Sequence, residues 1–209
     1  MTLRIAVVPG IAAGWIAVGS PAAHLDHHLL TAHMAQHLLL MVVAAPLILI
    51  GVRPSLHMRW HPHPALCWLA GSLTVILWHV PLMFELAMRF SYWHMIEYAS
   101  FFVAGLLFWY PVIHAEFTSG PWLLPLYLFL ATLPCDALSA FLAFCGRVVY
   151  PNYLSARGGM FGLSPLEDQA LAGTLMWFVV TLAYLIPALV VAARVLWGAP
   201  MRVGEAGAS

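Results

Sequence analysis

The sequence predicts an all-α fold, a polytopic transmembrane helical bundle of about six spans. Composition is the first indication, because 63% of the 209 residues are apolar and 8% are charged, whereas soluble domains carry about 25% charged residues. The second indication is that apolar residues gather into stretches near the roughly 20 helical residues that cross a bilayer. These stretches are Ile5–Gly19, Thr31–Gly51, Ala65–Met83, His94–Ile113, Trp122–Phe144 and Gln169–Leu196.

The first stretch has two interpretations. It is short, contains Pro9 and Gly10, and is followed by the small residues of Ser20–Ala23. An arginine, an apolar run and small residues are also typical of a cleaved signal peptide. We interpret residues 5–19 as a retained helix, because no sizeable soluble domain follows that would need export. Residues 1–198 then form a single transmembrane bundle, and the tail of residues 199–209 is predicted to be disordered.

The arginines indicate an orientation. If the spans alternate in direction, five arginines fall on one side of the membrane and three on the other. The first group is Arg4, Arg53, Arg59, Arg194 and Arg202, and the second is Arg89, Arg147 and Arg157. This bias favours both termini in the cytoplasm. The formal net charge is zero, which argues against a nucleic-acid partner.

Four of the later spans carry ionisable groups in otherwise apolar stretches. In chain order these groups are His33 and His37, His79, His94 and Glu97, and Asp136. At about 1.5 Å per residue, His37 lies about 9 Å below the outer end of its span, and His79 and Asp136 each lie about 21 Å above the inner end of theirs. A hydrocarbon core is about 30 Å thick, so all three lie in its outer third. Ionisable groups inside a bilayer mark function by default, and we therefore predict one shared site.

The chemistry of this site suits a metal ion. His33 and His37 are four residues apart, so both rings project from one helical face. Imidazole binds copper, zinc and iron, and thioethers favour copper(I). The predicted ligands are His33, His37, His79 and His94. The carboxylates predicted to accept a hydrogen bond from the second ring N–H of a ligating histidine are Glu97, Asp136 and Asp168. The accessory candidates are Met34, Met41, His24, His27 and His28.

Other interpretations of the same residues stay open. Each histidine taken alone could simply hydrogen-bond to a neighbouring helix. His37 and His79 at matching depth could ligate a b-type haem, although their neighbours are Leu and Met rather than small residues. A metal or proton transporter would need polar residues continuing inward from Asp136, and that stretch is apolar after Thr132. The sequence has no H-E-x-x-H frame or phosphate-binding glycine loop, so we do not expect an enzyme.

Five short motifs follow one another along the chain. They are His33–Leu40 with Ala45–Leu47 and Gly51, Trp78–Pro81, His94–Glu97, Phe108–Pro111, and Leu166–Gln169 with Gly173 and Met176–Trp177. In this order they resemble the CtaG-type cytochrome c oxidase assembly factors, over residues 24 to 190. Many members of that family carry a histidine directly after the glutamate of the H-x-x-E motif. Tyr98 stands there in this chain, so the position supplies no nitrogen ligand.

The resemblance implies a multi-pass protein of the bacterial plasma membrane that serves the maturation of a haem–copper oxidase. It implies copper delivery, with a cytochrome c oxidase subunit and a periplasmic copper chaperone as partners and lipid around the bundle. In this hypothesis the protein takes copper(I) on its outer side at His33, His37, His79 and His94 and passes it to a nascent oxidase subunit by ligand exchange.

Overall fold

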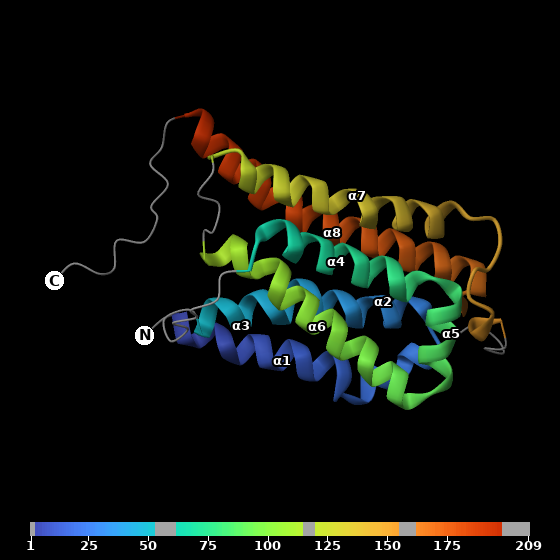
Figure 1. Cartoon of the computed structure of the whole chain (residues 1–209). Helices are drawn as coiled ribbons and strands as arrows, with labels where there is room; N and C mark the ends of the chain where they lie inside the picture. The colour runs from blue at the N-terminus through green and yellow to red at the C-terminus, as the bar shows by residue number, and fades with distance from the viewer. Residues whose placement is uncertain (1–2, 53–61, 115–119, 155–161, 198–209) are drawn as a thin grey trace.

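The computed structural model describes residues 3–52, 62–114, 120–154 and 162–197, and every regular element in these ranges is helical (Figure 1). The α-helices are α1 (Val7–Val18), α2 (Leu30–Leu38), α3 (Ala45–Val52), α4 (Pro64–His79), α5 (Pro81–Arg89), α6 (Ser91–His114), α7 (Leu123–Phe144) and α8 (Pro165–Leu196). The shorter segments are η1 (Leu3–Ala6), η2 (Pro21–His27) and η5 (Pro151–Tyr153), which are 3-10 helices, and η3 (Leu39–Ala44), which is a π-helix. The all-α prediction is confirmed.

The described residues contain four or five candidate membrane spans. Four continuous helical segments are long and apolar enough, namely Leu30–Val52, Ser91–His114, Leu123–Phe144 and Pro165–Leu196. A fifth consists of α4 and α5, which are bent by 75° at their junction. Helix α1 has 12 residues, or about 18 Å, against a hydrocarbon core of about 30 Å. Against about six predicted spans, the described residues thus contain four or five candidates and the shorter helix α1. The predicted tail 199–209 lies outside the described residues.

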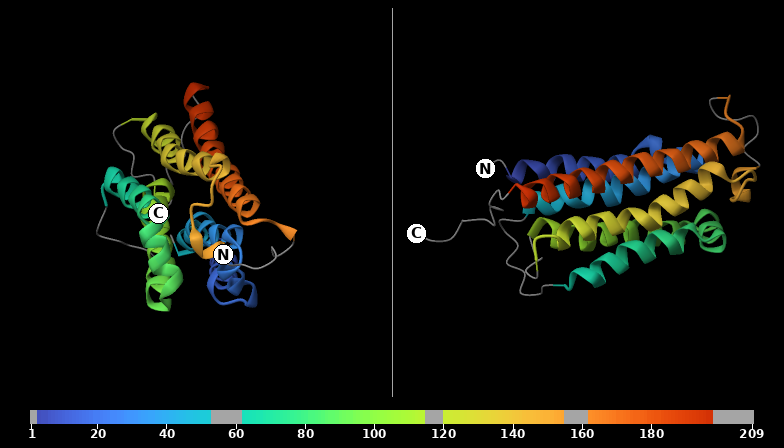
Figure 2. Two further views of the ribbon diagram at one scale, coloured as in Figure 1. Left: turned by 90° about the vertical axis from the view of Figure 1, so that its right-hand side faces the viewer. Right: turned by 90° about the horizontal axis from the view of Figure 1, so that it is seen from above.

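The helices run side by side along one long axis, as two perpendicular views show (Figure 2). The beginning of η1 and the end of α8 lie at the same end of the bundle, while α5 and η5 lie at the opposite end (Figure 1). We call this opposite end, which also holds the N-terminus of α6, the α5 end. The shared end of the first and last helices fits the expectation that both termini lie on one side of the membrane, and the side itself stays a prediction.

Close helix contacts depend on two glycines. A Cβ atom at Gly173 of α8 would lie 2.7 Å from the backbone nitrogen of Ala143 and 2.8 Å from the carbonyl oxygen of Ser139 in α7. A Cβ atom at Gly105 of α6 would lie 2.8 Å from the carbonyl oxygen of Met41. Small residues let helix backbones approach closely in a membrane, where packing rather than the hydrophobic effect drives association.

The third predicted span, Ala65–Met83, is broken at Val80. Proline disfavours the α conformation in the residue before it and has no backbone N–H, so α4 ends at His79 and Pro81 begins α5. Val80 is extended, with φ −64° and ψ 125°. The carbonyl oxygen of His79, freed by the break, accepts a hydrogen bond from the Tyr150 hydroxyl at 3.0 Å. The break therefore fixes His79 at the end of a helix.

The second span contains the π-helix η3, which the apolar pattern did not predict. Its middle residue Met41 offers a backbone carbonyl that accepts a hydrogen bond from Trp109 Nε1 at 3.1 Å. The same carbonyl lies against Gly105, so the wider turn lies where α6 packs most closely. Single π turns inside α-helices occur frequently at functional sites.

Candidate metal centre

Three imidazoles surround the buried carboxylate of Glu97. Glu97 Oε1 lies 3.3 Å from His33 Nε2 and 3.4 Å from His37 Nε2. Glu97 Oε2 lies 3.9 Å from His94 Nε2. Glu97 and His33 are both 0% exposed. We call His33, His37, His94 and Glu97 the Glu97 cluster.

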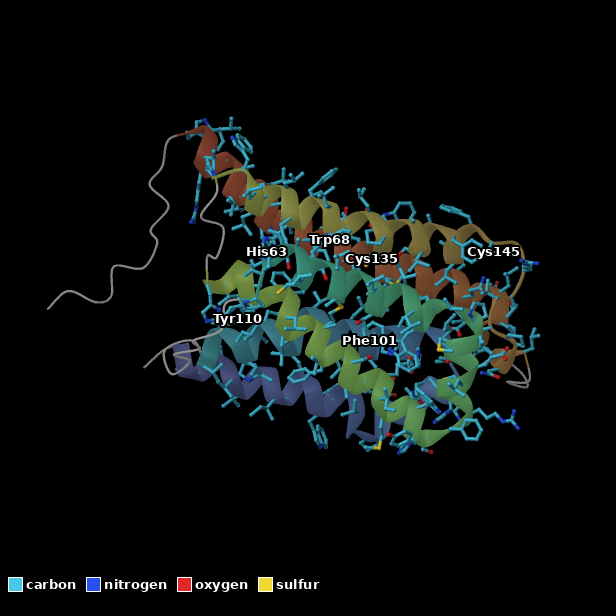
Figure 3. The ribbon with its side chains drawn as sticks, in the orientation of Figure 1. His63, Trp68, Phe101, Tyr110, Cys135 and Cys145 are labelled. Atoms are coloured by element: carbon cyan, nitrogen blue, oxygen red, sulfur yellow. The ribbon has the colours of Figure 1, made fainter. Side chains whose placement is uncertain are left out.

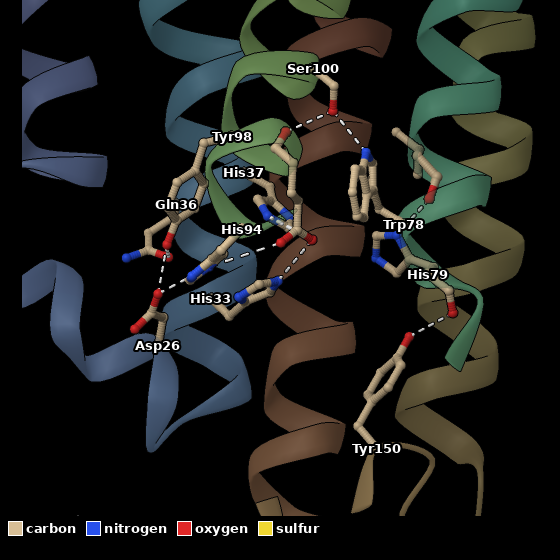
Figure 4. A network of polar contacts seen from close by, with 12 residues as sticks. Asp26, His33, Gln36, His37, Trp78, His79, His94, Tyr98, Ser100 and Tyr150 are labelled. Carbon is tan, nitrogen blue, oxygen red and sulfur yellow. Dashed lines mark hydrogen bonds and ion pairs between the residues drawn. The ribbon is translucent and has the colours of Figure 1, made fainter. Parts of the chain in front are cut away.

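Two helices supply this cluster in pairs one turn apart. His33 and His37 come from α2, and their ring centroids are 4.3 Å apart. His94 and Glu97 come from α6, where a spacing of three residues places them on one face. The His33 and His94 rings stack across the helix contact, with centroids 5.7 Å apart. The predicted convergence of the His33/His37 and H-x-x-E pairs is therefore present (Figure 4).

Asp26, a residue that the sequence analysis did not select, is part of the same network. It lies in η2 and is 2% exposed, with Oδ2 3.3 Å from His94 Nε2 and Oδ1 3.8 Å from His27 Nε2. The Tyr98 hydroxyl lies 2.6 Å from Asp26 Oδ2 and 2.8 Å from Gln36 Oε1. The only sequence signal was an acid between histidines in His24–His28, and a loop gives no periodicity from which to predict its direction.

Tyr153 fixes Asp26 from the α5 end. Its hydroxyl donates a hydrogen bond to the backbone carbonyl of Asp26 at 2.7 Å. Burial, followed by the negative charge of Asp26, raises the pKa of the Tyr153 phenol. The phenol therefore keeps its proton at neutral pH and remains a hydrogen-bond donor to this loop.

Two groups of donor atoms are compact enough to hold an ion. In one, His33, His94 and Glu97 each offer an atom within 4.8 Å of the others, and in the second Asp26, His27 and His94 do so. His94 belongs to both groups. Several atoms of these residues, including Asp26 Oδ1, His94 Nε2 and Glu97 Oε2, are buried and have no hydrogen-bond partner in the described structure. Buried polar atoms without partners are costly, and a bound cation would satisfy them.

His79 lies apart from the Glu97 cluster, at the end of α4 (Figure 4). His37 and His79 both line a cavity of about 20 Å³, together with the accessory candidates Met34 and Met41. Small-molecule cofactor pockets measure about 300–1,000 Å³, so the space between these two rings is far too small for a haem. The predicted ligands therefore separate into the Glu97 cluster and His79.

Two of the predicted carboxylates have other partners. Asp136 Oδ1 accepts a hydrogen bond from Thr181 Oγ1 of α8 at 3.2 Å. The Asp168 carboxylate accepts hydrogen bonds from the backbone N–H groups of Leu30 and Thr31 at 2.6 and 3.1 Å. Neither has a histidine among its hydrogen-bond partners in the described residues. Asp168 instead caps the helix that carries His33 and His37, and Asp136 joins α7 to α8.

The loop histidines lie at the surface. His24 and His27 are exposed and line a cleft of about 180 Å³ whose floor includes Asp26 and His94. His28 is also exposed and does not line this cleft. The cleft connects the exposed histidines of η2 with the buried donors, so an ion can approach the Glu97 cluster from the solvent side.

A family model described as cytochrome c oxidase caa3 assembly factor matches residues 4–197. No curated protein and no solved structure is significantly similar to the chain. The match covers all the helices that form the two donor groups, and it agrees with the resemblance in the five sequence motifs. The chain therefore belongs to the cytochrome c oxidase caa3 assembly factor family.

Proposed function

We propose that this protein binds copper at the Glu97 cluster and delivers it to a subunit of cytochrome c oxidase during assembly. The observation that carries the proposal is the convergence of three imidazole Nε2 atoms on one fully buried carboxylate, at 3.3, 3.4 and 3.9 Å. A buried negative charge is costly unless it is paired, and a metal cation pairs it directly. His33, His94 and Glu97 are the proposed ligands, with His37 as a fourth.

Copper fits the donor set. Imidazole nitrogens supply three of its four donors, and imidazole is a ligand that suits copper. The family's role in assembling a cytochrome c oxidase, an enzyme that contains copper, points to the same ion. Because the protein belongs to an assembly family, the bound ion is cargo, and we propose no catalytic reaction.

The two donor groups suggest how cargo moves. His94 belongs both to the group with Asp26 and His27 and to the group with His33 and Glu97. An ion bound first at the cleft can exchange Asp26 and His27 for His33 and Glu97 while it stays bound to His94. Reversal of the same exchange returns the ion to the cleft, where a partner protein can take it.

The cleft would then face the outside of a bacterial plasma membrane. Support comes from the five-to-three distribution of arginines, which favours cytoplasmic termini, and from the position of η1 and the end of α8 opposite the α5 end (Figure 1). In this orientation a periplasmic copper chaperone could load the cleft, and membrane lipid would surround the apolar helices. The oxidase subunit would accept copper at the same end.

Metal analysis with an optical spectrum tests the proposal on the detergent-purified full chain. We expect the wild type to bind copper and the His33→Ala/His94→Ala variant to lose one equivalent. His114→Ala is the control, because His114 is the last residue of α6, whereas His94 lies in the first turn of the same helix. Equal copper in the wild type and the double variant would contradict the site, and a Soret band would instead identify a haem protein.

A further inference from the structure

The cavity between His37 and His79 is lined by sulfur. Four sulfur-containing residues border it, namely Met34, Met41, Cys135 and Met176. All four are buried, with exposures of 1%, 6%, 6% and 4%. They come from α2, η3, α7 and α8, and Cys135 lies near the middle of the bundle (Figure 3). We call this space the sulfur cavity.

His79 presents an unpaired nitrogen in this cavity. Its Nδ1 donates a hydrogen bond to the carbonyl oxygen of Val75 at 2.7 Å, because a carbonyl can only accept. The neutral ring therefore carries its lone pair on Nε2, which is buried and has no hydrogen-bond partner in the described structure. Metal-binding histidines almost always donate the other ring N–H to a carbonyl or carboxylate. His79 has this arrangement without belonging to the Glu97 cluster.

We infer that the sulfur cavity is a second metal site, which binds a single copper(I) ion through His79 and the sulfur atoms of Cys135 and Met176, with His37, Met34 and Met41 completing its lining. This inference rests on the proposed copper-binding function and deepens it. The Glu97 cluster offers nitrogen and oxygen donors, whereas this cavity offers soft donors. His37 contacts both, through Glu97 Oε1 at 3.4 Å and through the cavity wall.

The chemistry of the cavity selects copper(I). Soft thioether and thiolate ligands favour copper(I) over copper(II). A single positive charge is also less costly in an apolar interior than a double one, and the thiolate of Cys135 cancels it when the thiol proton is released to solvent. A cavity of about 20 Å³ exceeds the roughly 10–15 Å³ that one water needs, so it has room for one ion.

The sulfur cavity has its own approach from the surface. His79 also lines a cleft of about 360 Å³ at the α5 end, together with the exposed Pro81 and Arg147. This cleft is separate from the one that His24 and His27 border. His79 therefore borders both the sulfur cavity and a surface cleft that the Glu97 cluster does not line. We expect each site to load when the other has been removed by mutation.

An anaerobic titration with copper(I), followed by X-ray absorption at the copper edge, tests the inference on the purified full chain. We expect the wild type to bind two equivalents, one of them with sulfur neighbours. The Cys135→Ser/Met176→Leu variant should lose one equivalent and the sulfur signal. The matched control is Cys67→Ser/Met88→Leu, since Cys67 is buried on α4 and Met88 is half-buried on α5 and neither lines the cavity.

The outcomes separate this inference from the proposed function. If His33→Ala/His94→Ala loses one equivalent and keeps sulfur-bound copper, both sites are supported. Copper with only nitrogen and oxygen neighbours in the wild type overturns the sulfur site and leaves the Glu97 cluster standing. A wild type that binds no copper overturns both. The X-ray absorption spectrum of the wild type tests for sulfur-bound copper even if the cavity variant does not fold.

Discussion

The carboxylate of Asp168, in the first turn of α8, accepts a hydrogen bond from the backbone N–H of Leu30 at 2.6 Å. The same carboxylate accepts hydrogen bonds from the backbone and hydroxyl of Thr31 at 3.1 and 2.6 Å. One side chain thus accepts hydrogen bonds from the first backbone N–H groups of α2, although its own helix begins more than 130 residues later in the chain. The contact sets the rotation and height of α2, which begins three residues before His33.

Removing this cap should weaken both stability and metal binding. We expect Asp168→Ala to lower the free energy of unfolding by about 1–3 kcal/mol, because it leaves buried N–H groups without a charged acceptor. Copper affinity should also fall, although Asp168 is not among the proposed ligands. Thermal unfolding and metal titration in detergent measure the two effects. The neighbouring Glu167→Ala is the control, since Glu167 bonds only Ser164 at an exposed position; a similar loss there would contradict the argument.

Glu97→Gln should reduce copper affinity at the Glu97 cluster about tenfold or more while leaving the fold intact. The amide keeps the volume of the carboxylate but removes the negative charge that the three imidazoles surround. A competition titration with a copper chelator gives the affinity. Glu85→Gln provides a matched loss of one negative charge, because Glu85 is an exposed residue of α5. Equal affinity in the two variants would show that the Glu97 charge plays no part in binding.

Tyr98→Phe should destabilise the η2 loop. The hydroxyl lies within hydrogen-bond distance of both Asp26 Oδ2 and Gln36 Oε1. Its single proton serves one of them at a time, so its loss leaves a buried acceptor short of a donor at a cost of about 1–3 kcal/mol. We expect a lower unfolding temperature and faster hydrogen exchange in residues 21–28. Tyr92→Phe is the control, because Tyr92 is 71% exposed. Unchanged exchange in the Tyr98 variant would mean that Tyr153 and Gln36 hold this segment without the Tyr98 hydroxyl.

Gly173→Ala should lower the unfolding temperature even though alanine is the better helix former. A methyl group there would meet backbone atoms of α7 at 2.7 and 2.8 Å, and overpacking of this kind costs about 1–3 kcal/mol. Gly14→Ala should be neutral or stabilising by up to about 1 kcal/mol, because the nearest atom of a neighbouring helix, Ala44 Cβ, would lie 3.9 Å from the new methyl group. The two variants share one chemical change, so comparison of their melting curves isolates the contact between α7 and α8.

The fold and half of the candidate site follow from local sequence patterns. Apolar length predicts the helices, and the spacing of His33 with His37 and of His94 with Glu97 predicts which side chains share a face. Depth along a helix is also a local property. Cys135 lines the cavity beside His37 and His79, so the depth that the sequence assigns to its neighbour Asp136 is also the depth of this cavity.

The remainder of the site depends on how helices are rotated against their partners. Asp136 follows Cys135 by one residue, which turns its side chain by about 100° on a helix, and it contacts Thr181 of α8 instead of a histidine. The depth of a residue along its helix can be predicted from a single sequence, but the rotation of that helix against its neighbours cannot. Asp26 was missed for a related reason, since its direction is set by contacts with Tyr98 and Tyr153, far away in the sequence.

The π-helix η3 lies between two halves of one span that face different neighbours. In a continuous α-helix the direction of one half would fix the direction of the other. His33 and His37 lie before it and face α6, whereas Ala44 at its end and Ile48 of α3 lie against Gly10 of α1. The wider winding of η3 absorbs about one extra residue, so deleting one residue within Leu39–Ala44 would restore ordinary α-helical winding and leave α3 facing α1 much as before. The half that carries His33 and His37 and the half that packs on α1 can therefore keep their orientations when the segment between them gains or loses one residue.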